Sequence, residues 1–248
     1  LFYLYVPYHA LDIYVRGAIG ELWAMVFLPL VFLGLYRLVR GRSYALPIAS
    51  LAYAAIIFSH NLTAIMALPF ILLLSLILLV CSKNKVQFII HNLAFIILAL
   101  SVSVSYWLPA LTEMRLTKVF SQIGGGADWR DHFVFPDQLW TSPWGFGGSA
   151  AGRLDGMSFM IGKWHLLAVL ISLITAIWLW RRKQARLSLT IFAGLTIFLL
   201  AVFLTTEYSW FIWQSAPVMA FIQYPWRFLM LATLAASFLA GSVGWWLE

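Results

Sequence analysis

The sequence predicts an all-α integral membrane protein, on three observations. Of its 248 residues, 63% are hydrophobic and 10% are charged, against roughly a quarter charged in an ordinary soluble domain. The mean hydropathy is +0.90. Long apolar runs alternate with short polar connections along the chain. A soluble domain needs far more polar surface than this to cover its core, so the composition excludes a soluble enzyme, a disordered chain and a nucleic-acid-binding domain.

Seven apolar runs meet or approach the ~20 residues that a helix needs to cross ~30 Å of hydrocarbon. Each must be helical, because lipid offers the backbone no hydrogen-bond partner. The runs are residues 22–38, 44–59, 62–81, 88–108, 164–180, 187–206 and 228–247. We therefore expect one polytopic domain over residues 1–248, with about seven transmembrane helices. We expect residues 1–8 to be the end of a preceding helix, and the chain to be a fragment of a larger polytopic protein.

The basic residues gather in three short connections, which the alternation of the spans places on one side of the membrane. Basic loops mark the cytoplasmic side. Nine of the 16 basic residues lie there: Arg37, Arg40, Arg42, Lys83, Lys85, Arg181, Arg182, Lys183 and Arg186. The opposite side then holds eight of the nine acidic residues, so we expect any functional site on the extracytoplasmic face. The middle of each predicted span contains no Asp, Glu, Lys or Arg, which weakens a transporter or pump interpretation.

Residues 109–163 form a 55-residue outer loop between the fourth and fifth spans. Connections of that length are usually functional or disordered, and this one is rich in Trp and Phe, among them Trp144, which argues against disorder. It also contains nine of the 16 glycines, which permit tight turns and close approach to a ligand. We expect a lid or a sugar-stacking surface packed on the helix ends. The alternative is a loop whose aromatic residues belong to the interfacial belt.

The densest polar cluster of this loop is Asp128-Trp129-Arg130-Asp131-His132. Asp128, Asp131 and His132 are candidates for proton transfer, or for binding a divalent cation as a cofactor. Their spacing is a weak metal signature, so we assign no metal site. The alternative is a solvated turn with a local ion pair. Asp137-Gln138 and Asp155-Gly156 are expected to mark turns.

Two arginines of the outer side are candidate phosphate ligands. In the N-terminal segment, Asp12 and Arg16 are i,i+4 neighbours and can form an ion pair if the segment is helical. The guanidinium fork of Arg16 suits a phosphate or a carboxylate, and Glu21 lies at the outer mouth of the first span. Arg227 follows Tyr224-Pro225-Trp226 at the start of the last span. The alternatives are an ion-paired helix end for Arg16 and a snorkelling anchor for Arg227.

Further candidates lie at the outer ends of other spans. Ser59-His60-Asn61 forms a tight turn in which Asn61 is expected to cap the third span. His60 should find a hydrogen-bond partner there. Glu113 lies just beyond Tyr106-Trp107-Leu108-Pro109, where the fourth span ends. Asn61 and Glu113 are candidate substrate-binding residues, whereas Glu21 and His60 are candidates for orienting groups or exchanging protons.

An ordered series of motifs extends over nearly the whole chain: YHALDIYVRGAIGELWA, SHN, YWLPAL, DHFVFPDQL, SPWGFGGS, DGMSFMIG and QYPWRFL. The series resembles bacterial multi-spanning membrane proteins labelled "6-pyruvoyl-tetrahydropterin synthase-related domain" proteins. The compact three-histidine zinc site of the soluble pterin enzyme is not expected here, because the histidines are scattered along the chain. The membrane family in turn resembles GT-C glycosyltransferases, which take a sugar from a polyprenyl-phosphate carrier at the outer face of the membrane.

The resemblance implies a glycosyltransferase of the bacterial inner membrane, with a polyprenyl-phosphate-linked sugar as its donor. The aspartate that acts as general base in such enzymes would lie upstream of Leu1, so the chain would supply the donor side. Arg16 and Arg227 would hold the carrier phosphate, and the outer loop would cover the sugar. The alternative is a non-enzymatic lipid or solute transporter, or a flippase-like protein, that uses the same arginines. A structural assembly subunit is a third possibility.

Overall fold

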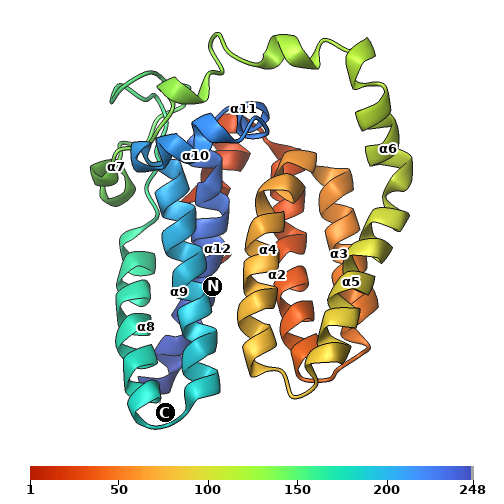
Figure 1. Cartoon of the computed structure of the whole chain (residues 1–248). Helices are drawn as coiled ribbons and strands as arrows, with labels where there is room; N and C mark the ends of the chain where they lie inside the picture. Colours follow the sequence, from red (N-terminus) through yellow and green to blue (C-terminus); the bar gives the residue numbers. More distant parts are fainter. Residues whose placement is uncertain (247–248) are drawn as a thin grey trace. The chain divides into compact units, whose positions relative to one another are not determined.

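A computed structural model describes residues 1–246, and every regular element among them is helical (Figure 1). The long helices are α2 (Ile19–Val39), α3 (Ala45–Ser59), α4 (Asn61–Cys81), α5 (Lys85–Val102), α8 (Lys163–Arg181), α9 (Ala185–Thr205) and α12 (Leu229–Ala240). Six segments are long and apolar enough to cross a membrane, the last being Pro225–Gly244. The chain is therefore an all-α integral membrane protein, as predicted. The apolar helix α3 has only 15 residues, so the number of spans stays a prediction. The predicted last run ends at residue 247, outside the described residues.

The remaining elements are short. They are α1 (Pro7–Ala10), η1 (Leu11–Arg16), α6 (Val104–Thr112), η2 (Met114–Leu116), η3 (Val119–Gln122), η4 (Trp129–Asp131), α7 (Pro136–Trp140), η5 (Glu207–Ser209), α10 (Trp210–Ser215), α11 (Met219–Ile222), η6 (Pro225–Phe228) and η7 (Gly241–Trp246). The chain divides into two compact units. One, the central unit, comprises Ile19–Phe120. The other, the terminal unit, comprises Leu1–Ala18 together with the chain from Ser121 onward.

The central unit is built from α2 to α6, with α2 to α5 running alternately up and down (Figure 1). Helices α2 and α3 approach closely, since a Cβ atom added at Gly34 would lie 2.6 Å from the Cβ of Ala49. Small residues allow such close packing in membranes, where side-chain hydrogen bonds between helices add to it. The Tyr53 hydroxyl of α3 donates to the Ala64 carbonyl of α4 at 3.0 Å. The Ser75 hydroxyl of α4 donates to Asn92 Oδ1 of α5 at 2.7 Å.

The fourth predicted span, 88–108, is wrong as one continuous helix. The structure has two helices, α5 and α6, that meet at the buried residue Ser103. The Ser103 hydroxyl donates to the Ala99 carbonyl at 2.8 Å, a back-bonding pattern that bends helices. Across the junction, the Trp107 indole N–H donates to the Leu100 carbonyl at 2.8 Å. The apolar pattern continues through this point, so hydropathy alone does not reveal the junction.

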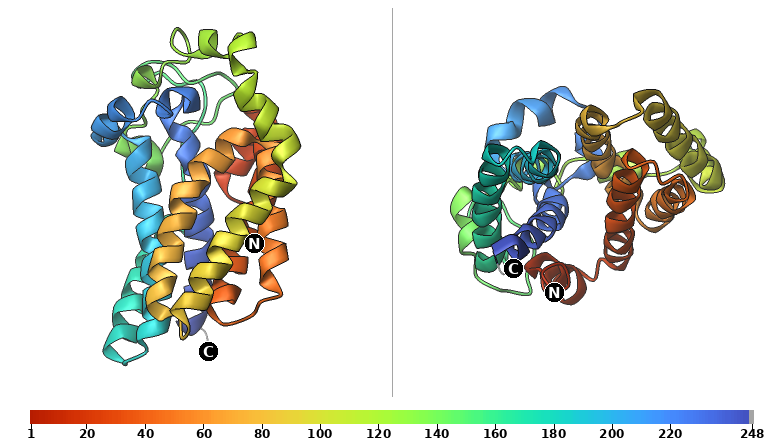
Figure 2. Two further views of the ribbon diagram at one scale, coloured as in Figure 1. Left: turned by 45° about the vertical axis from the view of Figure 1, so that its right-hand side comes forward. Right: turned by 90° about the horizontal axis from the view of Figure 1, so that it is seen from below.

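The terminal unit centres on α8, α9 and α12, seen nearly end-on in the right-hand view of Figure 2. Nearly every residue of α12 is buried. Small hydroxyl side chains join these helices. Ser172 of α8 donates to the Leu239 carbonyl of α12 at 2.8 Å, and Ser188 of α9 donates to the Ala176 carbonyl of α8 at 2.7 Å.

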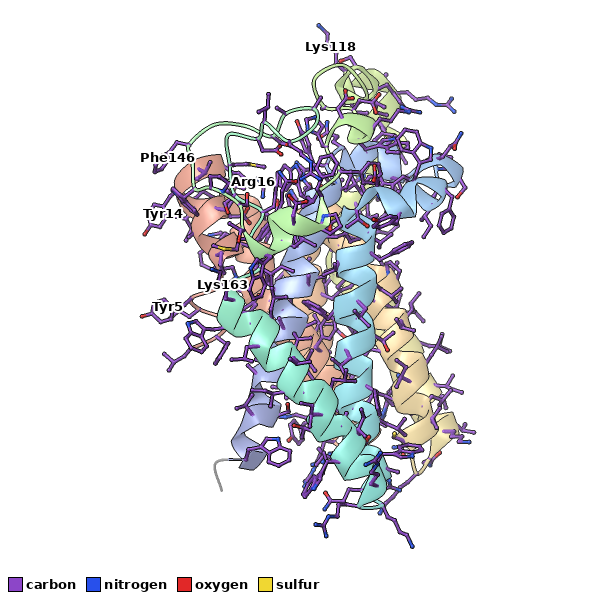
Figure 3. The ribbon with its side chains drawn as sticks, turned by 90° about the vertical axis from the view of Figure 1, so that its left-hand side faces the viewer. Tyr5, Tyr14, Arg16, Lys118, Phe146 and Lys163 are labelled. Atoms are coloured by element: carbon purple, nitrogen blue, oxygen red, sulfur yellow. The ribbon has the colours of Figure 1, made fainter. Side chains whose placement is uncertain are left out.

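The N-terminal segment packs against α8, but not as the end of a helix that stops at residue 8. Leu1 to Val6 form a turn, and the helical residues begin at Pro7 and continue through η1 to Arg16. His165 Nε2 of α8 donates to the Phe2 carbonyl at 2.9 Å. Tyr5 and Tyr14 point away from the helices of this unit (Figure 3).

The part of the outer loop that belongs to the terminal unit packs on the helix ends, as expected. The Val134 amide donates to the Thr205 carbonyl, at the end of α9, at 2.8 Å. The Trp129 ring lies 4.8 Å from that of Trp210 and 5.7 Å from that of Trp213, both in α10. Phe146 projects outward from the same loop (Figure 3). Aromatic packing therefore holds this segment against α9 and α10.

Because α2 and α3 approach closely, adding one methyl group at Gly34 should destabilise the fold. Gly34→Ala should force the helices apart at Ala49 and lower the free energy of unfolding by roughly 1–3 kcal/mol, as overpacking typically does. Gly241→Ala is the matched control, because Gly241 has helical backbone angles and no atom within 4 Å of an added Cβ. Thermal unfolding in detergent, followed by tryptophan fluorescence, measures both. Equal midpoints for the two variants would contradict the predicted contact.

Candidate functional site

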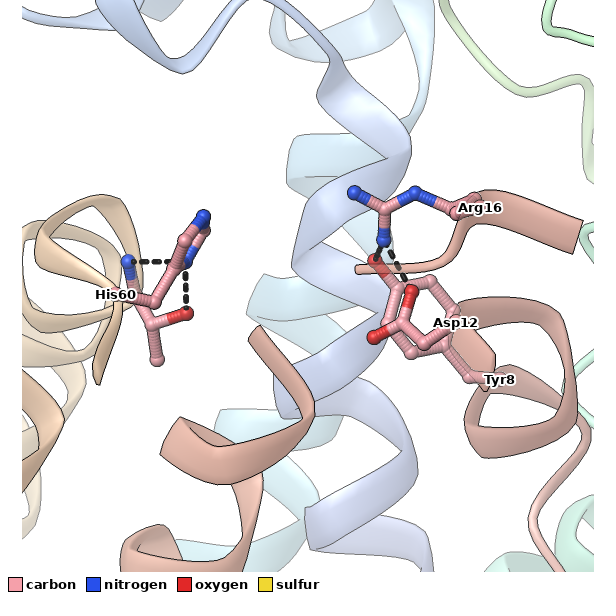
Figure 4. Close-up of polar contacts among 5 residues, drawn as sticks. Tyr8, Asp12, Arg16 and His60 are labelled. Atoms are coloured by element: carbon pink, nitrogen blue, oxygen red, sulfur yellow. Dashed lines mark hydrogen bonds and ion pairs between the residues drawn. The ribbon is translucent and has the colours of Figure 1, made fainter. Parts of the chain in front are cut away.

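Arg16 lies in a buried polar cluster of the terminal unit. Its Nη1 atom forms an ion pair with the Asp12 carboxylate and donates to the Tyr8 hydroxyl at 3.2 Å (Figure 4). The Asp12 side chain is 0% exposed and that of Arg16 is 12% exposed. The predicted i,i+4 pair is thus confirmed, although it forms in a π-helical turn. Gly17 ends this turn with φ of 60°, a backbone conformation that favours glycine.

Arg227, the second predicted phosphate ligand, lies near the same aromatic ring as Arg16. The Arg16 guanidinium carbon lies 4.5 Å from the centroid of the Trp226 ring, and that of Arg227 lies 6.0 Å from it. Tyr224 stacks on Trp226 with 5.0 Å between ring centroids. Arg227 Nη1 donates to the Ile222 carbonyl at 2.8 Å, which holds its guanidinium group at the end of α11. Cations on the face of an aromatic ring are held by its quadrupole, so both arginines lie against this pair of rings. The Arg227 guanidinium carbon is nearer to the Tyr224 centroid, at 5.1 Å.

We call Tyr8, Asp12, Arg16, Tyr224, Trp226 and Arg227 the arginine–tryptophan cluster. Sequence reasoning singled out Asp12, Arg16 and Arg227 but missed the role of Tyr8. The available signal was its spacing, because Tyr8 precedes Asp12 by four residues, as Asp12 precedes Arg16. In a helical segment, side chains at this spacing lie on one face.

His132 connects the outer loop to this cluster. Its ring lies 4.8 Å from that of Tyr224, edge to face. Its Nε2 lies 3.1 Å from the Gly126 carbonyl, which can only accept. Its Nδ1 lies 2.9 Å from the hydroxyl of Ser149, which in turn donates to Asp155 Oδ1 at 3.1 Å. His132 therefore links Gly126, Ser149 and Asp155 of the loop to the Tyr224 ring.

Asp155 is the acceptor on which the loop network depends. Besides Ser149, it accepts from the Ala150 amide at 3.0 Å and from Gln138 Nε2 at 2.8 Å. It therefore links separate parts of the loop, which sequence reasoning missed. The prediction of a turn at Asp137-Gln138 is wrong, because both residues lie within helix α7. The neighbouring backbones are tightly apposed, since a Cβ at Gly156 would lie 2.7 Å from the Cα of Gly147. The signal in the sequence is the recurrence of glycine beside Asp155 and Ser149.

The other loop candidates remain at the surface. Asp128 forms an ion pair with Arg130 at 3.0 Å and accepts from the Arg130 amide, which fits the alternative interpretation of a turn with a local ion pair. Asp131 and Glu113 are exposed. Trp144 is 47% exposed and touches Phe146. Within residues 1–246, no three His, Cys, Asp or Glu side chains come together as metal ligands.

The predicted residues of the central unit lie at helix N-termini. His60 caps α4, because its Nδ1 accepts from the Thr63 amide at 3.3 Å and lies 2.8 Å from the Thr63 hydroxyl (Figure 4). A neutral His60 therefore carries its proton on Nε2. The prediction that Asn61 is the cap is wrong: Asn61 is the first residue of α4 and is exposed. Glu21 is buried in the first turn of α2, where the helix dipole favours an acidic side chain.

His9 and Tyr3 adjoin the cluster in sequence, with their rings in edge-to-face contact at 4.8 Å. Burial lowers the pKa of His9 below its ordinary value of 6.5, against an opposing hydrogen bond with the Leu4 backbone. Burial also raises the pKa of the Tyr3 hydroxyl. Both effects favour the neutral form of the side chain. This pair therefore packs the N-terminal segment and contributes no charge to the arginine–tryptophan cluster.

No protein-family model matches the chain, and no curated protein or solved structure matches it either. The class of protein is therefore defined by the fold: a multi-pass, all-α membrane protein. Its candidate site is a buried cluster of arginine and aromatic side chains, contacted by an ordered loop.

The buried ion pair predicts a large effect of Asp12→Ala on stability. The substitution leaves the Arg16 charge buried without its carboxylate partner, which typically costs roughly 3–5 kcal/mol. The control is Asp137→Ala, which removes the partner of Arg153 from a pair whose side chains are 61% and 58% exposed. Exposed pairs contribute about 0–1 kcal/mol. Unfolding of both variants in detergent measures the difference, and equal losses would contradict the burial of Asp12.

Proposed function

We propose that the protein is part of a glycosyltransferase that takes a sugar from a polyprenyl-phosphate carrier. We place its site on the extracytoplasmic face of a bacterial inner membrane. The observation that carries the proposal is the convergence of Arg16 and Arg227 on the Trp226 ring, at 4.5 and 6.0 Å from its centroid. The sequence motifs resemble those of bacterial "6-pyruvoyl-tetrahydropterin synthase-related domain" membrane proteins, a family that in turn resembles GT-C glycosyltransferases, and this resemblance supports the same assignment.

The charges of the cluster suit a phosphate. Arginine stays protonated at all physiological pH values and presents a planar fork of donors that matches phosphate oxygens. Arg16, Arg227 and Asp12 together carry one net positive charge. The Arg16 side chain is only 12% exposed, and shielding from water strengthens its attraction for an anion. A carrier phosphate beside these groups would therefore be bound and oriented.

The reaction would be a nucleophilic displacement at the anomeric carbon of the sugar. The acceptor hydroxyl forms a new C–O bond, its proton passes to a general base, and the bond from the anomeric carbon to the phosphate oxygen breaks. The electron pair of that bond leaves with the carrier phosphate. Arg16 and Arg227 would stabilise the charge that develops on this oxygen.

Other residues take supporting roles in this proposal. Tyr8 and Asp12 hold Arg16, and the Tyr224 ring stacks on Trp226 beside both arginines. The network of His132, Ser149 and Asp155 keeps the loop in contact with Tyr224 and would let it cover the sugar. Glu21 and His60 belong to the central unit, and their assignment as residues that orient polar groups or exchange protons stays a prediction from the sequence.

A transfer assay tests the proposal. The full-length protein, reconstituted in liposomes, is given radiolabelled polyprenyl-phosphate sugars and a membrane extract as the source of acceptor. Arg16→Lys and Arg227→Lys should each lower kcat/KM by about 10- to 100-fold, the effect of losing a charge-assisted hydrogen bond. Arg182→Lys is the control, because Arg182 also lies over a tryptophan, Trp178, but in the basic α8–α9 connection.

Wild-type rates for both cluster variants would contradict the assignment. Absence of transfer from every donor, with saturable binding of the carrier retained, would favour the transporter or flippase-like alternative. A structural subunit would show neither carrier binding nor transfer.

A further inference from the structure

The Trp226 indole N–H is an unused donor in the middle of the arginine–tryptophan cluster. Trp226 is 3% exposed, and its Nε1 atom is buried without a hydrogen-bond partner among the described residues. A buried indole N–H usually has a partner, since leaving it unpaired forfeits the hydrogen bond it would make with water. The unpaired N–H of Trp226 therefore departs from the usual pattern.

Other tryptophans show that this fold ordinarily supplies an acceptor. The Trp213 indole N–H, also buried, donates to the Leu204 carbonyl at 3.1 Å. The Trp246 indole N–H donates to the Thr175 hydroxyl at 2.8 Å. Trp226 instead has aromatic rings and guanidinium groups against it: Tyr224, Phe159, Arg16 and Arg227. Guanidinium groups cannot accept a hydrogen bond, so these two neighbours leave the donor unsatisfied.

We propose that the Trp226 N–H binds a phosphoryl oxygen of the ligand that Arg16 and Arg227 attract, which makes Trp226 a binding residue for the phosphate ester. This inference rests on the proposed function and names a further contact for its donor substrate. Two guanidinium groups within 6.0 Å of the ring centroid and an unpaired N–H on the same ring favour an oxygen that carries negative charge. A charged oxygen also matches the net positive charge of Arg16, Arg227 and Asp12, which a neutral acceptor does not.

Because the N–H is buried, ligand binding requires a local rearrangement. The donor is enclosed in this structure, so an oxygen reaches it only when a neighbouring side chain moves. Without the ligand, the unpaired N–H destabilises the fold, and with the ligand it adds affinity. Removing the N–H should therefore leave the free protein no less stable but weaken its binding of phosphate esters.

Two substitutions isolate the N–H group. Trp226→Phe keeps an aromatic ring for the arginines, and site-specific replacement of Trp226 by β-(3-benzothienyl)alanine exchanges the N–H for sulfur at nearly constant volume. Trp213→Phe is the matched control, because it removes an equally buried indole whose N–H has a partner within the fold. The full chain is reconstituted in nanodiscs, and binding of decaprenyl phosphate, phosphatidylglycerol and inorganic phosphate is measured by tryptophan fluorescence and thermal shift.

Both Trp226 replacements should weaken binding of decaprenyl phosphate by about 10- to 100-fold, the effect of losing a hydrogen bond to a charged group. Trp213→Phe should bind as the wild type does and lose more thermal stability than Trp226→Phe. The wild type could bind inorganic phosphate or phosphatidylglycerol as tightly as decaprenyl phosphate, with the same loss of affinity in the Trp226 variants. That result would support the contact and identify a general phosphate site.

Binding by both Trp226 replacements within twofold of the wild type would overturn the proposal. So would the absence of saturable binding of all three probes by the wild type. Weakened binding in the variants, combined with no sugar transfer by the wild type, would support the contact while refuting the proposed enzymatic function.

Discussion

The buried ion pair between Asp12 and Arg16 is the interaction on which the terminal unit depends most. A guanidinium that leaves water needs a counter-charge and further polar or aromatic contacts. Asp12 supplies the charge, the Tyr8 hydroxyl accepts a hydrogen bond, and the Trp226 ring lies 4.5 Å from the guanidinium carbon. Because Trp226 belongs to η6, at the start of α12, satisfying Arg16 fixes the N-terminal segment against that part of the chain.

Contacts with Trp226 and Tyr224 also position the outer loop. Tyr224 stacks on Trp226, and His132 packs against Tyr224. His132 is hydrogen-bonded to Ser149, and Asp155 accepts hydrogen bonds from both Ser149 and Gln138. A loop of this length would otherwise have a large entropic cost of ordering. Its aromatic contacts with α10 and the Asp155 network offset that cost, and together they place an ordered surface beside a pair of arginines.

Much of this architecture follows from the sequence. Composition and run length identified the apolar helices, and the spacing of Asp12 and Arg16 predicted their ion pair. The junction at Ser103 did not follow, because a hydroxyl bonded to its own helix backbone leaves the apolar pattern intact. The choice of His60 over Asn61 as the cap depends on backbone angles at one residue, φ −157° and ψ 97°. The meeting of Arg16 with Trp226 depends on tertiary packing, which no local pattern encodes.

A double-mutant cycle between Arg16 and Trp226 tests the central claim most directly, namely that the guanidinium packs on the indole ring. Unfolding free energies are measured in detergent for the wild type, Arg16→Met, Trp226→Leu and the double variant. The uncompensated Asp12 charge is present in both variants that lack Arg16, so to first order it cancels in the cycle. We expect a coupling energy of about 1–2 kcal/mol, the value for a desolvated cation–π contact. Additivity within about 0.3–0.5 kcal/mol would contradict it.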